Sequence, residues 1–225
     1  MIKFPPVSSA DENGLLAVSR NLDCHMLLSA YCQGVFPWPA DERNILWFSP
    51  PRRAILDLAA VRISPKLRRE FKNRGFSLRI NTAFDEVIRN CSQRNDGDGT
   101  WLTPPMLEAY MEFHRRGFVF SFETFHEERL VGGLYGTWIN SFFAGESMFY
   151  RESGASKFAL AEMVGFMRDQ AGLRWIDVQM LTPLLVRIGA VEIPRAEFLQ
   201  KLKVALKTPV AEPVAGYQLK QKENL

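Results

Sequence analysis

Histidine and cysteine are scarce in this sequence, with three of each among 225 residues. Cys24, Cys32 and Cys91 include no C-x-x-C pair, and the histidines do not stand at metal-ligand spacing. The pattern therefore disfavours a disulfide framework or a zinc site, and we expect no bound metal. Free thiols in a reducing compartment explain such cysteines more simply.

Long apolar runs are absent as well. No run reaches the roughly 18 residues of a membrane span, and the N-terminal stretch MIKFPPVSSADENG lacks the apolar core of a signal peptide. We therefore expect a cytoplasmic protein without a membrane partner. Hydrophobic residues still make up 47% of the chain, which suffices for one sizeable core or two smaller ones.

The net charge of +3 permits a nucleic-acid partner without requiring one. Positive charge concentrates between residues 52 and 79. Within this segment Ser64 and Pro65 predict the start of a short helix. Most of its polar positions are basic, namely Lys66, Arg68, Arg69, Lys72 and Arg74. Charge alone favours a solvated helix face, and the alternative is contact with a nucleic-acid backbone.

The second half of the chain predicts three strands, a helix and a fourth strand. The strands span 118–125, 130–139 and 141–149, the helix 156–170, and the fourth strand 175–180. Three strands so close in sequence must form an antiparallel meander. The helix then provides a right-handed crossover that makes the fourth strand parallel to the third. This order matches the core of a GNAT-type acyltransferase.

We therefore predict an α+β fold with a mixed sheet. A small N-terminal α/β domain covers residues 1–95, a GNAT-like acyltransferase domain covers 96–207, and a flexible tail covers 208–225. In the N-terminal domain the pattern predicts a helix over 22–34, followed by two short extended pieces around a loop between residues 35 and 58.

Polar residues interrupt the predicted strand over 175–180. Asp177 and Gln179 share one face of it, and an acid and an amide on a helix-covered strand are costly unless they are paired. They form either a structural hydrogen-bond pair or part of a site. Glu146 ends the third strand, which the crossover brings beside the fourth. Two carboxylates with unequal surroundings in such a cleft suit binding of an amine and acceptance of its proton.

The segment YRESGASK over 150–157 stands where a CoA enzyme of this fold carries its phosphate loop, Q/R-x-x-G-x-G/A. It has one glycine and an acidic residue, which disfavours CoA. The aromatic residues Trp38, Trp47 and Phe48 lie close in sequence to Arg52 and Arg53. Aromatic rings beside arginines suit a single-stranded RNA end. The alternative is a packing cluster, which we favour for Trp38; only one of the adjacent Trp47 and Phe48 can face the core.

Motifs distributed from about residue 13 to 200 resemble those of the leucyl/phenylalanyl-tRNA–protein transferase family. They are NGLLA (13–17), FPW (36–38), LWFSP (46–50), GTW (99–101), LVGGLYG (130–136), GESMF (145–149), ASK (155–157), IDVQ (176–179) and IPR (193–195). The resemblance implies a GNAT-like fold and transfer of Leu or Phe, with Met as a further candidate, from charged tRNA to the N-terminal Arg or Lys of proteins. The products are thereby marked for N-degron-dependent proteolysis. It implies no cofactor and no metal, and we expect a monomer.

The resemblance also implies roles for individual residues. The catalytic set is Asp177, Gln179 and Glu146, and the aminoacyl pocket consists of Leu134, Phe143, Met163 and Met167. The 3′ adenosine of the tRNA is expected at Trp47 and Phe48, and the tRNA backbone at Arg68, Arg69 and Lys72. The spacing of the two methionines agrees with a pocket, since they lie one helical turn apart and Met adapts to ligands of different shape.

Two alternative functions remain open at this stage. The first is a CoA-dependent GNAT acetyltransferase, which the missing phosphate loop disfavours. The second is a non-catalytic RNA- or degron-binding paralogue, which the presence of Glu146, Asp177 and Gln179 disfavours.

Overall fold

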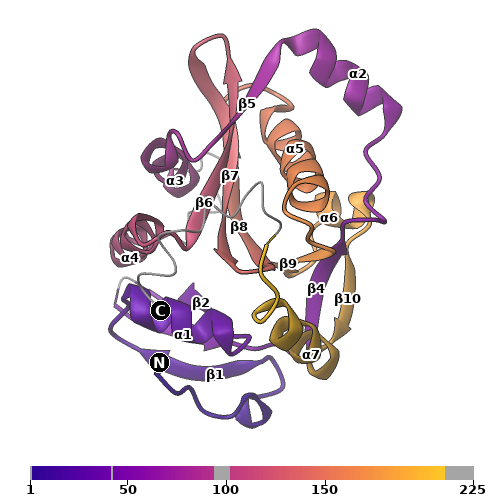
Figure 1. The fold of residues 1–225 in the computed structure, drawn as a ribbon. Coiled ribbons are helices and arrows are strands. Elements are labelled where there is room, and N and C mark those ends of the chain that lie inside the picture. Colours follow the sequence, from indigo (N-terminus) through magenta and orange to yellow (C-terminus); the bar gives the residue numbers. More distant parts are fainter. Residues whose placement is uncertain (1, 42, 94–101, 211–225) are drawn as a thin grey trace.

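The computed structural model describes residues 2–41, 43–93 and 102–210. Within them the chain forms a three-stranded and a seven-stranded sheet with helices packed around them (Figure 1). The GTW motif at residues 99–101 and the part of the expected tail beyond residue 210 lie outside the described residues.

The small sheet has the strand order β1-β3-β2 and is antiparallel throughout, with β1 at Leu15–Ser19, β3 at Ile45–Phe48 and β2 at Phe36–Pro39. The helix α1 (Cys24–Cys32) packs beside it, as the sequence predicts. Buried residues of this part belong to the same hydrophobic cluster as residues of α3 and α4. The small sheet therefore shares a core with the rest of the chain.

The large sheet carries the meander and the crossover. Its strand order is β10-β4-β9-β8-β7-β6-β5, and the bounds along the chain are β4 Arg52–Asp57, β5 Phe76–Ile80, β6 Val119–His126, β7 Arg129–Ile139, β8 Phe142–Tyr150, β9 Trp175–Gln179 and β10 Val191–Pro194. The pairs β6–β7 and β7–β8 are antiparallel, whereas β9 pairs with β8 in parallel. This confirms the α+β class, the mixed sheet and the GNAT-like order of elements.

Helices cover both faces of this sheet (Figure 1). The helix α5 (Ala155–Asp169) lies on one face, and α3 (Phe84–Ser92) and α4 (Pro104–Arg115) lie on the other. Because both faces are covered, β6 and β7 are buried almost continuously instead of alternately. The remaining helices of the described residues are the short 3₁₀ helix η1 (Val7–Ser9) and the α-helices α2 (Pro65–Arg74), α6 (Pro183–Ile188) and α7 (Arg195–Ala205).

Some strands differ from the prediction. The strands β4 and β5 precede residue 96 but belong to the large sheet, so the domain boundary expected there does not coincide with an edge of this sheet. The segment over 35–58 contains three strands where two extended pieces were predicted, and β1 and β10 were not predicted at all. Strands of four or five residues contain too few alternations to give a strong periodic signal.

The sequence predicts neither a disulfide framework nor a membrane span, and the cysteines and helices can be compared with both expectations. Cys24, Cys32 and Cys91 are not joined in disulfides, and the first and last of them are buried. None of the helices in the described residues is long and apolar enough to cross a membrane.

The contact between β7 and α5 can be tested at Gly132. A Cβ at this position would stand 2.5 Å from the Cβ of Ala155, at the start of α5. We expect Gly132→Ala to lower the free energy of unfolding by about 1–3 kcal/mol, because strand and helix must move apart. Gly165, inside α5, has open space around it, so Gly165→Ala is a matched control that should raise that free energy by about 0.5–1 kcal/mol. Urea unfolding measures both, and equal effects would contradict the close contact.

Candidate active site

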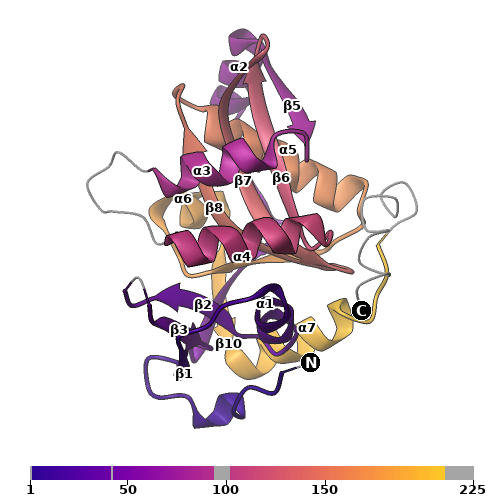
Figure 2. The ribbon, with the colours of Figure 1, turned by 90° about the vertical axis from the view of Figure 1, so that its left-hand side faces the viewer.

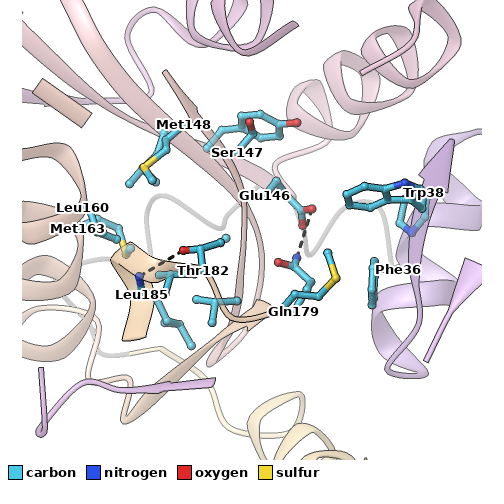
Figure 3. Close-up of a pocket in the computed structure, with 17 residues that line it drawn as sticks. Phe36, Trp38, Glu146, Ser147, Met148, Leu160, Met163, Gln179, Thr182 and Leu185 are labelled. Atoms are coloured by element: carbon cyan, nitrogen blue, oxygen red, sulfur yellow. Dashed lines mark hydrogen bonds between the residues drawn. The ribbon is translucent and has the colours of Figure 1, made fainter. Parts of the chain in front are cut away.

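A cavity of about 260 Å³ that is open to one side is lined by residues of β2, β7, β8, β9, α5 and α6 (Figure 3). Figure 3 shows Glu146 and Gln179 between an apolar wall and the two aromatic residues Phe36 and Trp38. The apolar wall consists of Leu134, Met148, Leu160, Met163, Ile176, Val178 and Leu185. The cavity therefore joins an apolar pocket to a polar centre.

The cavity forms where β8 and β9 separate. These parallel strands are paired at a single position, Ala144 opposite Asp177. The residues that follow on each strand, from Gly145 on β8 and from Val178 on β9, line the cavity instead of pairing with each other. The cavity thus occupies the place where the sequence predicted a cleft between its third and fourth strands.

Both strands are irregular at this point. On β8, Gly145 pairs with Gly136 and Ser147 pairs with Tyr135, so Glu146 is an extra residue without an opposite partner. On β9, Asp177 and Gln179 pair with consecutive residues of β4, so Val178 is likewise extra. Such bulges bend a strand and redirect its side chains. The two bulges turn the side chains of Glu146 and Gln179 toward the gap between the strands.

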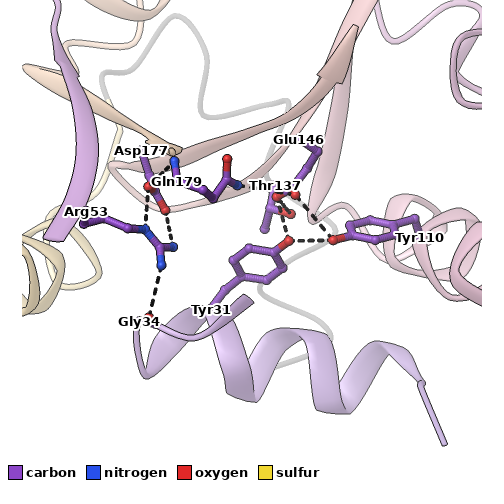
Figure 4. Close-up of polar contacts among 8 residues, drawn as sticks. All are labelled: Tyr31, Gly34, Arg53, Tyr110, Thr137, Glu146, Asp177 and Gln179. Atoms are coloured by element: carbon purple, nitrogen blue, oxygen red, sulfur yellow. Dashed lines mark hydrogen bonds and ion pairs between the residues drawn. The ribbon is translucent and has the colours of Figure 1, made fainter. Parts of the chain in front are cut away.

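Four side chains donate hydrogen bonds to Glu146 (Figure 4). The Tyr31 hydroxyl lies 2.6 Å and the Thr137 hydroxyl 3.1 Å from Oε1. The Tyr110 hydroxyl and the Gln179 Nε2 each lie 3.4 Å from Oε2. The donors come from α1, α4, β7 and β9, so elements far apart in the sequence hold the carboxyl in place.

The protonation of Glu146 is shifted by its surroundings. Burial raises the pKa of its carboxyl to about 7, although the hydrogen bond from Tyr31 acts in the opposite direction. Burial and the neighbouring Glu146 charge raise the pKa values of Tyr31 and Tyr110 well above the usual value, so both phenols keep their protons. Near neutral pH Glu146 is therefore able to accept a proton from a bound group.

Asp177 has a different environment. Its carboxylate is fully buried and pairs with Arg53, with Nε 2.8 Å from Oδ1 and Nη2 2.6 Å from Oδ2 (Figure 4). Its Oδ1 also accepts a hydrogen bond from the backbone N–H of Gln179 at 3.0 Å. The sequence placed Asp177 in the cleft beside Glu146, whereas the structure turns its carboxylate toward Arg53 and away from the cavity lining. Arg53, in turn, is too buried to bind the phosphates expected beside it.

The predicted aminoacyl pocket is divided by the structure. Leu134 and Met163 line the cavity, whereas Phe143 and Met167 are fully buried in the hydrophobic cluster behind it. Helical spacing placed both methionines on the core-facing stripe of α5, but it cannot tell which turn of the helix borders a cavity. Met148 was missed, although alternation along β8 from Glu146 gave a signal for it.

Trp47 is buried and Trp38 lines the cavity, which is the reverse of the expectation. Trp47 is fully buried, its Nε1 donates to the Ser19 hydroxyl, and its ring contacts Phe4 edge-on. Its ring is therefore not open to a nucleotide base, which corrects the expected stacking. Phe48 is half-buried against Phe36. Trp38, which the sequence assigned to packing, is 38% exposed and lines the cavity.

The basic helix α2 lies apart from the cavity. Arg68, Arg69 and Lys72 are exposed, and Phe71 is the buried residue of the helix. In both views α2 lies at the end of the molecule opposite the small sheet (Figures 1 and 2). This placement suits a solvated face, and it leaves these side chains accessible to a long partner.

The start of α5 is closed to a phosphate group. Gly132 of β7 packs against Ala155, and a Cβ on Gly154 would lie 3.2 Å from the carboxylate Oε1 of Glu70. A carboxylate at a helix N-terminus competes with a bound pyrophosphate. This geometry disfavours the CoA alternative. In the part of the chain that the structure describes, no three His, Cys, Asp or Glu side chains are grouped so that they could hold a metal ion.

Comparison with known proteins identifies the family of the chain. The family described as "Leucyl/phenylalanyl-tRNA protein transferase" matches residues 55–203, and its N-terminal domain family matches residues 20–51. The N-terminal match ends between β3 and β4, and the second match begins within β4, where the chain enters the large sheet. The solved structure of L-PGS from Bacillus licheniformis is 17% identical, with a TM-score of 0.41 over 60% of this chain and 48% of that chain, which is too distant to support a conclusion.

Several relatives are similar over nearly their whole length. The leucyl/phenylalanyl-tRNA–protein transferase of Azoarcus sp. (strain BH72) is 46% identical over 87% of this chain and 84% of its own. Those of Thiobacillus denitrificans and Anaeromyxobacter sp. (strain K) are 44% and 43% identical, each over 92% of this chain and over 91% and 89% of their own. The chain belongs to the leucyl/phenylalanyl-tRNA–protein transferases, a family of aminoacyltransferases.

Proposed function

We propose that the chain transfers Leu or Phe from the 3′ end of its tRNA to the N-terminal Arg or Lys of a protein. The observation that supports this most is the joining of an apolar wall to a single carboxylate in one cavity. The wall suits a Leu or Phe side chain, and Met148 and Met163 can adapt to either. Among the described residues that line the cavity, Glu146 has the formal charge that attracts a cationic acceptor.

The tRNA end is proposed to stack on Trp38. This ring is exposed on β2 and lies across the polar centre from the apolar wall (Figure 3). Bases of single-stranded nucleic acids stack on exposed aromatic rings of this kind. Trp38 thereby replaces Trp47 as the candidate for the 3′ adenosine.

The chemistry consists of one acyl transfer. The acceptor α-amine attacks the ester carbonyl carbon, the new C–N bond forms, and the C–O bond to the ribose breaks. The amine proton passes to the ribose oxygen that leaves. Since the ester is already activated, alignment of the amine with the carbonyl provides most of the acceleration. Glu146 can accept the amine proton and pass it on, and Gln179 orients Glu146 through its amide.

The products of this reaction carry a new N-terminal Leu or Phe, and we propose that this residue marks them for N-degron-dependent proteolysis. The contact between Glu146 and Gln179 in the cavity supports transfer over the non-catalytic alternative. The assay that follows separates the two functions.

Transfer of radiolabelled Leu, Phe or Met from charged tRNA to peptides beginning with Arg, Lys or Ala tests the function directly. We expect Leu and Phe to label the Arg and Lys peptides and leave the Ala peptide unlabelled. Binding of charged tRNA without labelling of any peptide would instead favour the non-catalytic paralogue. In a parallel assay, labelling of the peptides from radiolabelled acetyl-CoA would favour the acetyltransferase.

The role of Trp38 predicts a defect in tRNA binding. Trp38→Ala should raise the KM for aminoacyl-tRNA about 10-fold, because stacking of one base contributes about 1–3 kcal/mol. Val18→Ala, at a position 59% exposed on β1, is the control and should leave KM unchanged. Steady-state kinetics at saturating peptide measure both. An unchanged KM in Trp38→Ala would show that the adenosine lies elsewhere.

The raised pKa of Glu146 predicts the pH dependence of transfer. Below about pH 7 the carboxyl is mostly protonated and cannot accept the amine proton, so kcat/KM should rise with pH through about 7. Glu146→Gln should lose this ascending limb and about 10²-fold in activity. It should keep the rise near pH 8 that comes from the acceptor amine.

Protein stability reports the same titration independently. An ordinary glutamate has a pKa near 4.5, so between pH 4.5 and about 7 the folded state holds a proton that the unfolded state has lost. Stability from this group is therefore complete below pH 4.5 and lost as pH rises through about 7. We expect urea unfolding of Glu146→Gln to lack this loss, which amounts to roughly 1–3 kcal/mol. Parallel curves for both proteins would contradict the raised pKa.

The basic helix α2 is proposed to contact the tRNA backbone. Replacement of Arg68, Arg69 and Lys72 by Glu should weaken tRNA binding and reduce the slope of log K against log salt, since fewer phosphates are neutralised. Lys203→Glu with Lys207→Glu, at exposed positions in and after α7, is a control that reverses two charges instead of three. Filter binding at several salt concentrations measures both. An unchanged affinity would assign α2 to a solvated face.

A further inference from the structure

We propose that Arg53 is a positioning residue for aminoacyl transfer, acting through Asp177 on the backbone of Gln179. The inference rests on the proposed function and extends it to a residue that does not line the cavity. It begins from the burial of Arg53, which is 2% exposed although it sits between the solvent-facing Arg52 and the hydrophobic core.

The guanidinium of Arg53 is fixed on all sides. Its Cζ lies 4.5 Å from the ring centre of Phe36 and 4.6 Å from that of Phe198. Its Nε and Nη2 donate to the two oxygens of Asp177, and Nη1 lies 3.5 Å from the carbonyl oxygen of Gly34 (Figure 4). A planar cation held between two rings and bonded through both edges has no freedom to rotate. It therefore defines the position of the Asp177 carboxylate.

Asp177 passes this constraint to Gln179. The oxygen Oδ1 that accepts from Arg53 also accepts the backbone N–H of Gln179. Gln179 has φ +52°, in the left-handed region that non-glycine residues rarely adopt, and it follows the bulged Val178. Such a conformation persists only where its surroundings hold it. The hydrogen bond from Gln179 to Asp177 provides part of that hold.

The side-chain amide of Gln179 depends on this backbone conformation. From it, Nε2 reaches to 3.4 Å from Glu146 Oε2 at the polar centre of the cavity. If Asp177 shifts, the direction of the amide changes while the apolar wall and Trp38 remain in place. The expected effect is thus on the rate of transfer and not on substrate binding.

Arg53→Lys tests this dependence, because Lys retains the charge but cannot donate two parallel bonds or stack flat between rings. The unmodified chain is first shown to transfer Leu to an Arg peptide; absence of that transfer would overturn the proposed function and this inference together. In Arg53→Lys we expect kcat to fall about 10- to 100-fold. The KM values for aminoacyl-tRNA and for peptide should stay within about threefold.

Two further variants make the result decisive. Arg115→Lys, at the exposed ion pair with Glu112 on α4, should leave kcat unchanged. Phe198→Leu removes one ring of the cage without touching the cavity, and it decides the question if circular dichroism shows that Arg53→Lys does not fold; we expect its kcat to fall several-fold with unchanged KM. A folded variant with the kcat of the unmodified chain, or with an altered KM alone, would overturn the proposal.

Discussion

The single paired position between β8 and β9 is the constraint on which the site depends. The large sheet is paired on both sides of this point, and the crossover through α5 keeps the two strands in place while they separate. The gap gives room for a ligand, but it leaves polar side chains where strands would otherwise satisfy each other. Because buried polar groups need hydrogen-bond partners, Glu146 and Asp177 are bonded to side chains from other elements.

Glu146 and Asp177 have different hydrogen-bond partners, and this gives the two carboxyl groups different roles. Asp177 faces a full positive charge, and two short bonds to Arg53 fix the position of its carboxylate. Glu146 receives only hydroxyl and amide dipoles, which do not offset the loss of solvent, and its pKa rises. One acid is thereby committed to fixing the backbone, and the other retains the ability to exchange a proton. Two acids from neighbouring strands, which look equivalent in sequence, differ because of what the rest of the chain places against them.

Much of the fold was predictable because it depends on local pattern. The meander, the crossover helix and the parallel return of β9 all follow from the periodicity of segments close in sequence. The site was only partly predictable. Whether Trp38 or Trp47 faces the core depends on the order β1-β3-β2, in which β3 is the central strand. The partner of Asp177 lies 124 residues earlier on a strand whose place beside β9 no local pattern reveals.

The hydroxyl of Tyr31 connects the N-terminal part of the chain, which holds the small sheet, to Glu146 in the large sheet. It reaches from α1 to Glu146 and to the hydroxyl of Tyr110 on α4, so the segment that precedes β4 supplies an atom to the polar centre. The junction between β3 and β4 looks like a natural place to recombine relatives of this family. A chimera joined there would inherit its proton-accepting group from one parent and the tuning of that group from the other. The two parts of the chain match separate families in sequence, but the polar centre depends on residues from both.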